Sequence, residues 1–216
     1  MTVSTGVFIS FEGIDGAGKS SHIEPLAELF RQHGRSVTVT REPGGTVLAE
    51  QLRKLVLTEP MDGLTEALLV FAARHDHVRR LIRPALLRAE VILSDRFSDS
   101  SFAYQGGGHG LDVTVLTQLE RWVQGSCDAG EGGLLQPDLT LWFDLPPEQA
   151  ALRLAHARSP DRFEARESAF FERVQHAYVG RAANAAGRFV RIDAAAPRSQ
   201  VWEQVVAAVL SRGWLV

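Results

Sequence analysis

The 216-residue sequence contains a single cysteine, Cys127, and lacks the usual marks of a secreted or membrane-bound chain. One thiol cannot form an internal disulfide bond, which fits a reducing compartment. The N-terminal residues MTVSTGVFIS have no charged start and no long apolar core, so they do not resemble a signal peptide. No uninterrupted apolar run reaches the roughly 18 residues that a membrane-spanning helix needs. We therefore expect a cytoplasmic protein with no membrane partner.

The sequence also lacks an excess of positive charge. A net charge of -3 gives no general electrostatic reason to bind nucleic acid. Only Lys19 and Lys54 are lysines and the other basic residues are arginines, so an arginine is by itself weak evidence of phosphate binding. Lys19 stands out because a sequence that favours arginine has a lysine there. The only asparagine, Asn184, is not part of an Asn-Lys-x-Asp loop, which excludes the guanine-reading loop of a GTPase.

Short β-branched runs alternate with longer helical stretches along the chain, and no Pro- or Ser-rich linker interrupts them. The expected strands are residues 5–11, 36–40, 91–95, 139–145 and 188–193. The expected helices are residues 18–33, 46–57, 66–88, 113–124, 147–158, 168–186 and 198–212. This alternation predicts one α/β domain, residues 1–216, with a five-stranded parallel sheet flanked by helices on both faces. Ligands then bind at the carboxyl ends of the strands.

The stretch FEGIDGAGKS (residues 11–20) follows the first expected strand and opens the first expected helix. Gly13, Gly18, Lys19 and Ser20 fit the phosphate-loop pattern G-x-x-x-x-G-K-[ST]. Its glycines let backbone N–H groups converge on phosphate oxygens, and the helix N-terminus adds its dipole. Lys19 can reach the β- and γ-phosphates, and the Ser20 hydroxyl suits Mg²⁺. The predicted ATP-binding residues are Gly13, Gly16, Ala17, Gly18, Lys19, Ser20 and Ser21.

Further short motifs follow the phosphate loop in a fixed order. They are TREPGGT (40–46), FAAR (71–74), SDRF (94–97), SSFAYQGGG (100–108), QPDLTLWFDLPPE (136–148) and RFE (162–164). In content and order these motifs resemble those of thymidylate kinases, and the match covers most of the chain. The resemblance implies a P-loop nucleoside monophosphate kinase fold. It also implies transfer of the γ-phosphoryl group of ATP to dTMP with Mg²⁺, giving dTDP and ADP for dTTP synthesis.

The chemistry of such an acceptor agrees with the arginines in these motifs. A nucleoside monophosphate is already a dianionic nucleophile, so the protein has to bring two polyanions together rather than supply a base. Guanidinium groups suit this task because they bind phosphate with two hydrogen bonds. The resemblance places Arg41 and Arg96 on the acceptor phosphate, and we expect Arg96 and Lys19 to be catalytic. Asp95, at the end of an apolar strand, is expected to assist Mg²⁺ together with Ser20.

Base recognition is expected around FAAR and SSFAYQ. Phe71 and Arg74, three residues apart on an expected helix, share a face. Without the resemblance Phe71 would be interpreted as a core residue; the resemblance assigns it to thymine stacking and Arg74 to thymine O4. It also brings Ser101 and Gln105 to the base. The resemblance also implies that Tyr104 packs under the deoxyribose, where its ring would exclude a 2′-hydroxyl.

Asp15 is unusual inside a phosphate loop, because a carboxylate beside anions is costly unless it faces another group. In thymidylate kinases an acid at this position meets the 3′-hydroxyl of the acceptor, from which it accepts a hydrogen bond. The residue after it, Gly16, marks where one subtype of the family carries its catalytic arginine. Because position 16 holds a glycine and not an arginine, we expect the catalytic arginine to lie in the lid instead.

The segment of residues 151–164 follows the fourth expected strand and resembles the lid of nucleotide kinases, which excludes water when it closes. Arg153, Arg158 and Arg162 are the candidates for an arginine that acts on the transferring phosphoryl group. Arg153 and Arg162 keep the family position best, so they rank above Arg158. The segment 193–197 is expected to border the adenine.

Three other readings of the sequence remain open. Within the same class, the protein could be another monophosphate kinase. A deoxynucleoside kinase would need a base for the 5′-hydroxyl, and Glu12 or Asp15 could serve, although the arginine of TREPGGT suits a substrate that brings a phosphate. A nucleotide-dependent switch would bind ATP without transferring phosphate. The family resemblance further implies a homodimer that packs through long helices. The glycine-rich segment 125–138 has no assigned function.

Overall fold

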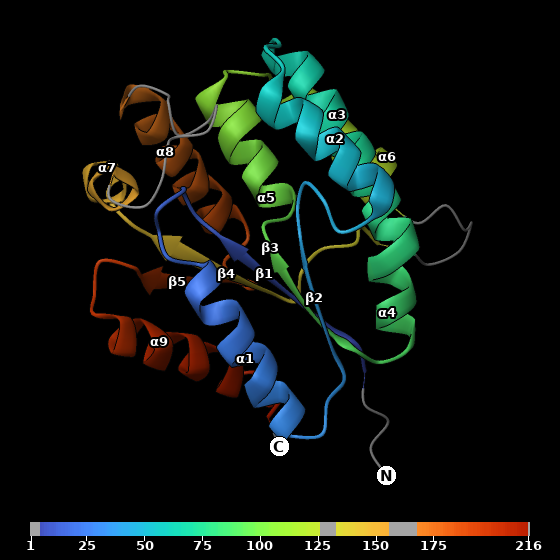
Figure 1. Ribbon diagram of the computed structural model, residues 1–216, viewed down its shortest axis with the longest axis vertical. Coiled ribbons are helices and arrows are strands. Elements are labelled where there is room, and N and C mark those ends of the chain that lie inside the picture. The colour runs from blue at the N-terminus through green and yellow to red at the C-terminus, as the bar shows by residue number, and fades with distance from the viewer. Residues whose placement is uncertain (1–4, 126–132, 156–167, 216) are drawn as a thin grey trace.

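The computed structural model describes residues 5–125, 133–155 and 168–215. Within them, five parallel strands form one sheet in the order β2-β3-β1-β4-β5 (Figure 1). The strands are β1 (Val7–Glu12), β2 (Val37–Arg41), β3 (Val91–Asp95), β4 (Leu139–Asp144) and β5 (Phe189–Asp193). The five predicted strands and the predicted fold class are confirmed.

Helices cover both faces of this sheet. The longer ones are α1 (Ser20–Gln32), α2 (Val47–Thr58), α3 (Gly63–His77), α6 (Val113–Gln124), α7 (Pro147–Ala155), α8 (Ser168–Asn184) and α9 (Arg198–Leu210). Figure 1 shows α1 and α9 together on one side of the sheet, while α2, α3, α4, α5 and α6 gather on the other.

The predicted helix of residues 66–88 is longer and less regular than expected. It begins earlier, because the Asp62 carboxylate caps α3 by accepting hydrogen bonds from the N–H groups of Leu64 and Thr65, both at 2.9 Å. It then passes through a π-helical segment, η1 (Val78–Ile82), into α4 (Arg83–Leu87). Pro84 lies at the start of α4 and cannot donate to the preceding turn, which accounts for the irregular winding before it.

A second irregular helix follows β3. The four residues of α5 (Ser98–Ser101) run directly into the π-helical segment η2 (Phe102–Gly108). Gly107 and Gly108 of η2 pack closely on α8, since a Cβ on Gly107 would lie 2.6 Å from the Ala177 side chain. The glycines of this segment therefore serve helix packing.

The sheet determines where ligands bind. β1 is central and all six of its residues are buried, whereas β2 lies at the edge and is partly exposed. The register pairs Phe11 of β1 and Arg41 of β2 with Asp95 of β3. Because the strands are parallel, their carboxyl ends meet at one edge of the sheet, which brings the phosphate loop, TREPGG and SDRF together.

A buried ion cluster joins elements that are far apart in the sequence. The Asp99 carboxylate in α5 accepts hydrogen bonds from Arg181 Nε of α8 at 2.8 Å and from Arg188 Nη1 at 2.6 Å. Its side chain has no exposed surface. The Arg181 guanidinium also lies 3.9 Å from the ring centroid of Phe102. One carboxylate thus pairs with two partly buried arginines, of which Arg181 also contacts Glu120 Oε1 at 3.4 Å.

We predict that Asp99→Asn lowers the free energy of unfolding by about 3 kcal/mol, because the Arg188 guanidinium loses its carboxylate partner and Arg181 keeps only the longer contact to Glu120. Urea denaturation measures the change. Glu24→Gln is the matched control, since it removes one partner of the exposed Arg31–Glu24 pair and should cost less than about 1 kcal/mol. Equal losses in the two variants would contradict the role given to the buried cluster.

Candidate active site

The phosphate loop has the shape that its glycines predict. Gly13, Gly16 and Gly18 all have positive φ, and a Cβ on Gly13 would lie 2.4 Å from the carbonyl oxygen of Phe143. Glycine is therefore required at position 13. Lys19 folds back over the loop, and its Nζ donates to the carbonyl oxygens of Gly13 at 2.9 Å and Ile14 at 3.0 Å. Burial, assisted by the positive charge of Arg96, lowers the pKa of Lys19 to about 8.

Ser20 and Asp95 meet where α1 begins, next to the phosphate loop. The Ser20 hydroxyl donates to Asp95 Oδ2 at 3.3 Å. Asp95 Oδ1 is buried and accepts no hydrogen bond from the residues that the structure describes. Hydroxyl and carboxylate oxygens are the ligands that Mg²⁺ prefers, so these residues fit the ion predicted for them.

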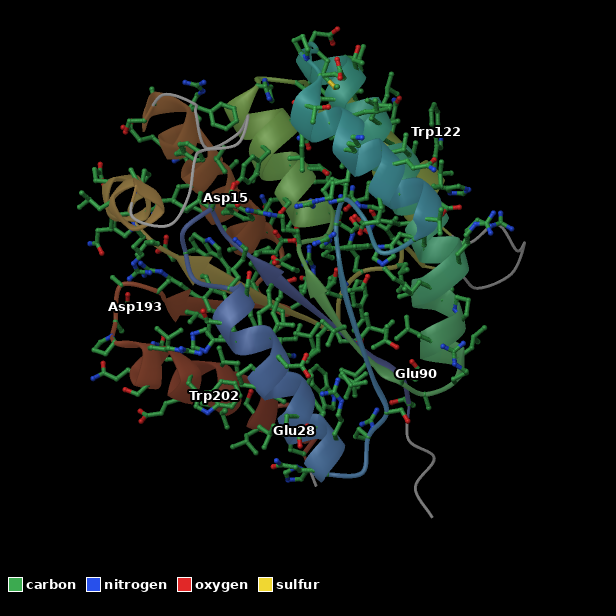
Figure 2. The ribbon with its side chains drawn as sticks, in the orientation of Figure 1. Asp15, Glu28, Glu90, Trp122, Asp193 and Trp202 are labelled. Atoms are coloured by element: carbon green, nitrogen blue, oxygen red, sulfur yellow. The ribbon has the colours of Figure 1, made fainter. Side chains whose placement is uncertain are left out.

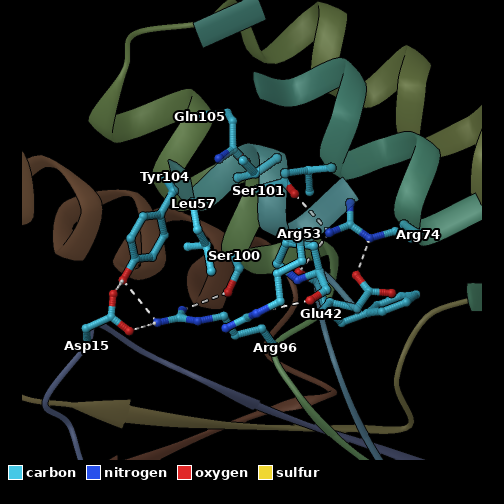
Figure 3. A pocket seen from close by; sticks show the side chains of 14 residues that line it. Asp15, Glu42, Arg53, Leu57, Arg74, Arg96, Ser100, Ser101, Tyr104 and Gln105 are labelled. Atoms are coloured by element: carbon cyan, nitrogen blue, oxygen red, sulfur yellow. Dashed lines mark hydrogen bonds and ion pairs between the residues drawn. The ribbon is translucent and has the colours of Figure 1, made fainter. Parts of the chain in front are cut away.

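A pocket opens on the other side of the phosphate loop and encloses about 600 Å³ of space, part of it continuous with solvent. Figure 3 shows Asp15 and Tyr104 at one side of the pocket, Arg74 at the opposite side and Arg96 along the floor. Its remaining polar lining includes Arg53, Ser101 and Gln105.

Arg96 sits where the phosphate loop and this pocket meet. Its φ of 73° is unusual for a residue with a side chain. Its guanidinium donates from Nη1 to the carbonyl oxygen of Gly13 at 2.9 Å, and from Nη2 to Asp15 Oδ1 at 2.7 Å and Tyr104 OH at 3.1 Å. The Tyr104 hydroxyl in turn donates to Asp15 Oδ2 at 3.1 Å.

This arrangement keeps Asp15 ionised. Burial alone would raise the pKa of its carboxyl group. The positive charges of Arg96 and Lys19 outweigh that effect and lower the pKa to about 2. The predicted contact residue is therefore an acceptor at neutral pH, as a hydrogen bond from a sugar hydroxyl requires.

Arg74, at the far side of the pocket, is held by three groups and is only 1% exposed. It donates to Glu42 Oε2 at 2.6 Å, to Ser101 Oγ at 2.9 Å and to the carbonyl oxygen of Phe97 at 3.2 Å. Its Nη1 is buried and donates to no group within the described residues. A ligand with an exposed carbonyl oxygen would satisfy that nitrogen.

Glu42 carries the charge that balances Arg74. Its second oxygen, Oε1, lies 2.9 Å from Nδ1 of His77, and Nε2 of that histidine lies 2.7 Å from the Thr40 hydroxyl. Burial opposes ionisation of Glu42, but Arg74 and His77 outweigh it and lower its pKa. Gln105 is held separately, through its Nε2 donating to Glu66 Oε1 at 2.9 Å.

The structure does not bring two predicted residues to this pocket. Phe71 is buried in an apolar cluster with Ala67 and Phe102, and the Arg74 guanidinium lies 4.7 Å from its ring centroid. Arg41 points toward the Ser20 and Asp95 side, where its Nη2 donates to Glu50 Oε2 at 2.9 Å.

Arg53 is a pocket residue that our sequence analysis missed. It lies on α2, donates to the carbonyl oxygen of Pro43 at 2.9 Å and lines the pocket with Arg96. Burial and the charge of Arg41 lower its pKa. A signal was present in the sequence, because Arg53 shares a helix face with Ala49 and Val56, both of which are buried.

Residues 156–164 of the lid segment, with Arg158 and Arg162, lie outside the described residues. Arg153 is the one lid arginine that the structure describes. Arg153 Nη2 donates to the carbonyl oxygen of Ala194 at 2.9 Å. Its Nη1 lies 4.0 Å from the place that a Cβ on Gly18 would take. Arg153 therefore lies beside the phosphate loop and the segment expected to border the adenine.

Glu12 does not line the pocket. It is fully buried, and it accepts hydrogen bonds from the N–H of Phe97, the Ser100 hydroxyl and the Tyr178 hydroxyl at 2.7, 2.6 and 2.9 Å. Burial, with a smaller effect of Asp99, raises the pKa of Glu12 to about 7. Since Glu12 cannot reach a ligand in the pocket, its position argues against a deoxynucleoside kinase that uses it as a base.

A phosphate loop at the edge of one parallel sheet, next to a second pocket lined by arginines, defines the P-loop nucleoside monophosphate kinase class. The chain matches the thymidylate kinase family over residues 11–205. It is 58% identical over 210 residues to the thymidylate kinase of Albidiferax ferrireducens, covering 97% of this chain and 98% of the relative. It is 59% identical over 210 residues to that of Paracidovorax citrulli, with 97% and 95% covered.

A solved structure agrees with these sequence matches. The crystal structure of thymidylate kinase from Ehrlichia chaffeensis superposes with a TM-score of 0.74 and 31% sequence identity, covering 95% of this chain and 99% of that one. The chain therefore belongs to the thymidylate kinase family, and its reaction is the ATP-dependent phosphorylation of dTMP to dTDP. Among the described residues, no helix has the length and apolar character needed to span a membrane.

The raised pKa of Glu12 predicts a specific pH dependence of stability. Its carboxyl group titrates at 4.5 in the unfolded chain and at about 7 in the folded protein, so the folded state binds the proton more tightly. The resulting stabilisation is complete below pH 4.5 and is lost as the pH rises through 7. Its size is about 3 kcal/mol, from 2.5 pKa units. Urea denaturation of the wild type and Glu12→Gln between pH 4.5 and 8 should show this slope only in the wild type. Parallel curves would contradict the prediction.

Proposed function

We propose that dTMP binds in the pocket between the phosphate loop and Arg74, with its phosphate near Arg53 and Arg96 and its base near Arg74. The observation that carries this placement is the polarity of the pocket. One end is positively charged and lies beside the phosphate loop, and the other end offers an unsatisfied guanidinium nitrogen. Thymine O4 is a carbonyl oxygen of the kind that Arg74 Nη1 would bind. Ser101 and Gln105 line the same end.

The deoxyribose would then lie between Asp15 and Tyr104. Asp15 is ionised and lines the pocket, so it can accept a hydrogen bond from the 3′-hydroxyl. The Tyr104 ring occupies the neighbouring wall, with its centroid 4.9 Å from the Arg96 guanidinium. A ring held there would leave no room for a 2′-hydroxyl, which favours deoxyribonucleotides over ribonucleotides.

ATP would bind with its phosphates on the loop from Gly13 to Ser21, where Lys19 lies within reach of them. Mg²⁺ would be held beside it by Ser20 and Asp95, and it would supply charge neutralisation between donor and acceptor phosphates. Lys19 and Arg96 lie between the two sites, so we assign them to stabilising the transferring phosphoryl group.

We also propose that the whole chain, residues 1–216, is one kinase domain and that residues 151–164 are its lid. The position of Arg153 beside Gly18 and Ala194 supports a role for this arginine at the edge of the donor site. Arg158 and Arg162 remain candidates for the arginine that acts on the γ-phosphoryl group. A cytoplasmic location fits a chain with one cysteine.

A homodimer is supported by one apolar surface of the molecule. Adjacent helices α2, α3 and α6 carry large apolar side chains that are exposed in the single chain. They are Leu48, Leu55, Leu64, Leu68 and Trp122. Trp122 is 73% exposed and points outward from α6 (Figure 2). We propose that this surface packs against its equivalent in a second copy.

The placement of the acceptor phosphate is tested by a matched pair of arginine variants. Arg53→Ala should raise KM for dTMP roughly tenfold to hundredfold, because it removes a charge-assisted hydrogen bond to the phosphate. Arg41→Ala, which removes an arginine outside the pocket, should change KM by less than about threefold. ADP release with dTMP, dUMP and thymidine as acceptors measures both, and KM for ATP should stay within twofold. A larger effect of Arg41→Ala would assign the phosphate contact to Arg41 instead.

The dimer is tested by placing a charge in the proposed interface. Trp122→Glu should convert the dimer into a monomer, because two buried carboxylates would face each other across the symmetric contact. Leu210→Glu on α9, a residue that is also exposed but lies outside this surface, should leave the mass unchanged. Sedimentation velocity at micromolar concentration measures the mass. A wild type that sediments as a monomer would overturn the proposal.

A further inference from the structure

A group of buried polar residues lies against Arg96; Ser100 of this group lines the pocket, whereas Glu12 and Tyr178 do not. Glu12, the last residue of β1, forms its centre and is fully buried. Its Oε1 accepts from the N–H of Phe97 at 2.7 Å. Its Oε2 accepts from Ser100 Oγ at 2.6 Å and from Tyr178 OH at 2.9 Å. A buried carboxylate is stable only when its oxygens are bonded in this way.

Tyr178 connects this group to a distant part of the chain. It comes from α8, 166 positions after Glu12, and none of its surface is exposed. Its ring stacks on Trp142 of β4, with 6.3 Å between centroids and an interplanar angle of 21°. Its hydroxyl lies 2.9 Å from Ser100 Oγ and accepts a long hydrogen bond, 3.4 Å, from Arg96 Nη1. Packing against Trp142 therefore fixes the Tyr178 ring, and its hydroxyl is held next to Glu12 and Ser100.

The same group explains how Arg96 holds its conformation. A residue with a side chain at φ 73° is strained, and it persists only where the surroundings determine it. Here the next residue, Phe97, is anchored through its N–H to Glu12, and Arg96 Nη1 is bonded to Ser100 Oγ at 3.0 Å and to Tyr178. One guanidinium nitrogen is therefore fixed from behind, while Nη2 faces Asp15 and Tyr104 in the pocket.

We propose that Glu12 and Tyr178 are positioning residues for the acceptor phosphate. They touch neither substrate, and they act by orienting the Arg96 guanidinium toward the place of that phosphate. The inference rests on the proposed function of Arg96 as a ligand of the dTMP phosphate. A guanidinium held in advance binds a phosphate without the cost of being ordered at that moment.

The test is Tyr178→Phe, which removes one hydroxyl and keeps the ring. Calorimetric titration with dTMP and with thymidine separates the phosphate contact from the rest of the site, because thymidine has no phosphate for Arg96. The dissociation constant for dTMP should rise roughly fivefold to tenfold, while that for thymidine should change less than twofold. A loss that is equal for both ligands, or no loss for either, would overturn the proposal.

Two further variants keep the result interpretable. Ser10→Ala removes another buried hydroxyl of β1, which pairs with Thr140 Oγ1 at 3.1 Å, and it should leave both dissociation constants unchanged. Glu12→Gln retains the shape of the side chain but can no longer accept three hydrogen bonds. It should show the same selective loss of dTMP binding, which provides the test if Tyr178→Phe does not fold.

Arg96→Ala distinguishes this inference from the proposed function on which it rests. Alone, it should weaken dTMP binding more than thymidine binding, because thymidine loses only the support that Arg96 gives to Asp15 and Tyr104. Equal losses for the two ligands would show that the assignment of Arg96 to the phosphate is wrong. In the Arg96→Ala background, adding Tyr178→Phe should have no further effect on dTMP, because both changes act through one guanidinium. Additive losses would show that Tyr178 acts by another route and would overturn the positioning role.

Discussion

The ion pair between Arg96 and Asp15, at 2.7 Å, is the interaction on which the site depends. Arg96 follows β3 and Asp15 belongs to the phosphate loop after β1, so their contact ties the donor loop to the acceptor pocket. The parallel sheet makes this possible, because Phe11 and Asp95 are register partners and both loops leave the sheet at the same edge. Moving either loop would separate the two substrates that have to meet in line.

The charged groups around this ion pair influence each other's ionisation even without a bound phosphate. Asp15 stays ionised because Arg96 and Lys19 lie close to it. Burial and the charge of Arg96, in contrast, disfavour the charged form of Lys19. A phosphate bound beside Lys19 would favour the charged form of the lysine and so offset part of the free-energy cost of burying that charge. The site is thus arranged so that its cations are best satisfied when both polyanions are present.

Local sequence was sufficient to predict the phosphate loop and the five strands, because a glycine pattern and β-branched runs act through their nearest neighbours. Arg96, Arg74 and Tyr104 were found from short motifs, and the structure brings them to one pocket. Arg53 was missed because its role depends on how α2 packs against the TREPGG loop. Arg41 belongs to the TREPGG motif itself, yet it ends a strand at the sheet edge, and its side chain lies toward Glu50.

The contacts behind Arg96 show what a single sequence does not contain. Tyr178 resembles any tyrosine on a helix until α8 packs against η2 and brings the Tyr178 hydroxyl to Glu12. The strain at Arg96 and the burial of Glu12 are each unfavourable alone, but they support each other, since the carboxylate anchors the turn that the arginine needs. Such a mutual dependence exists only in the folded chain. It also explains why a thymidylate kinase can keep a buried acid next to its phosphate loop without using it as a base.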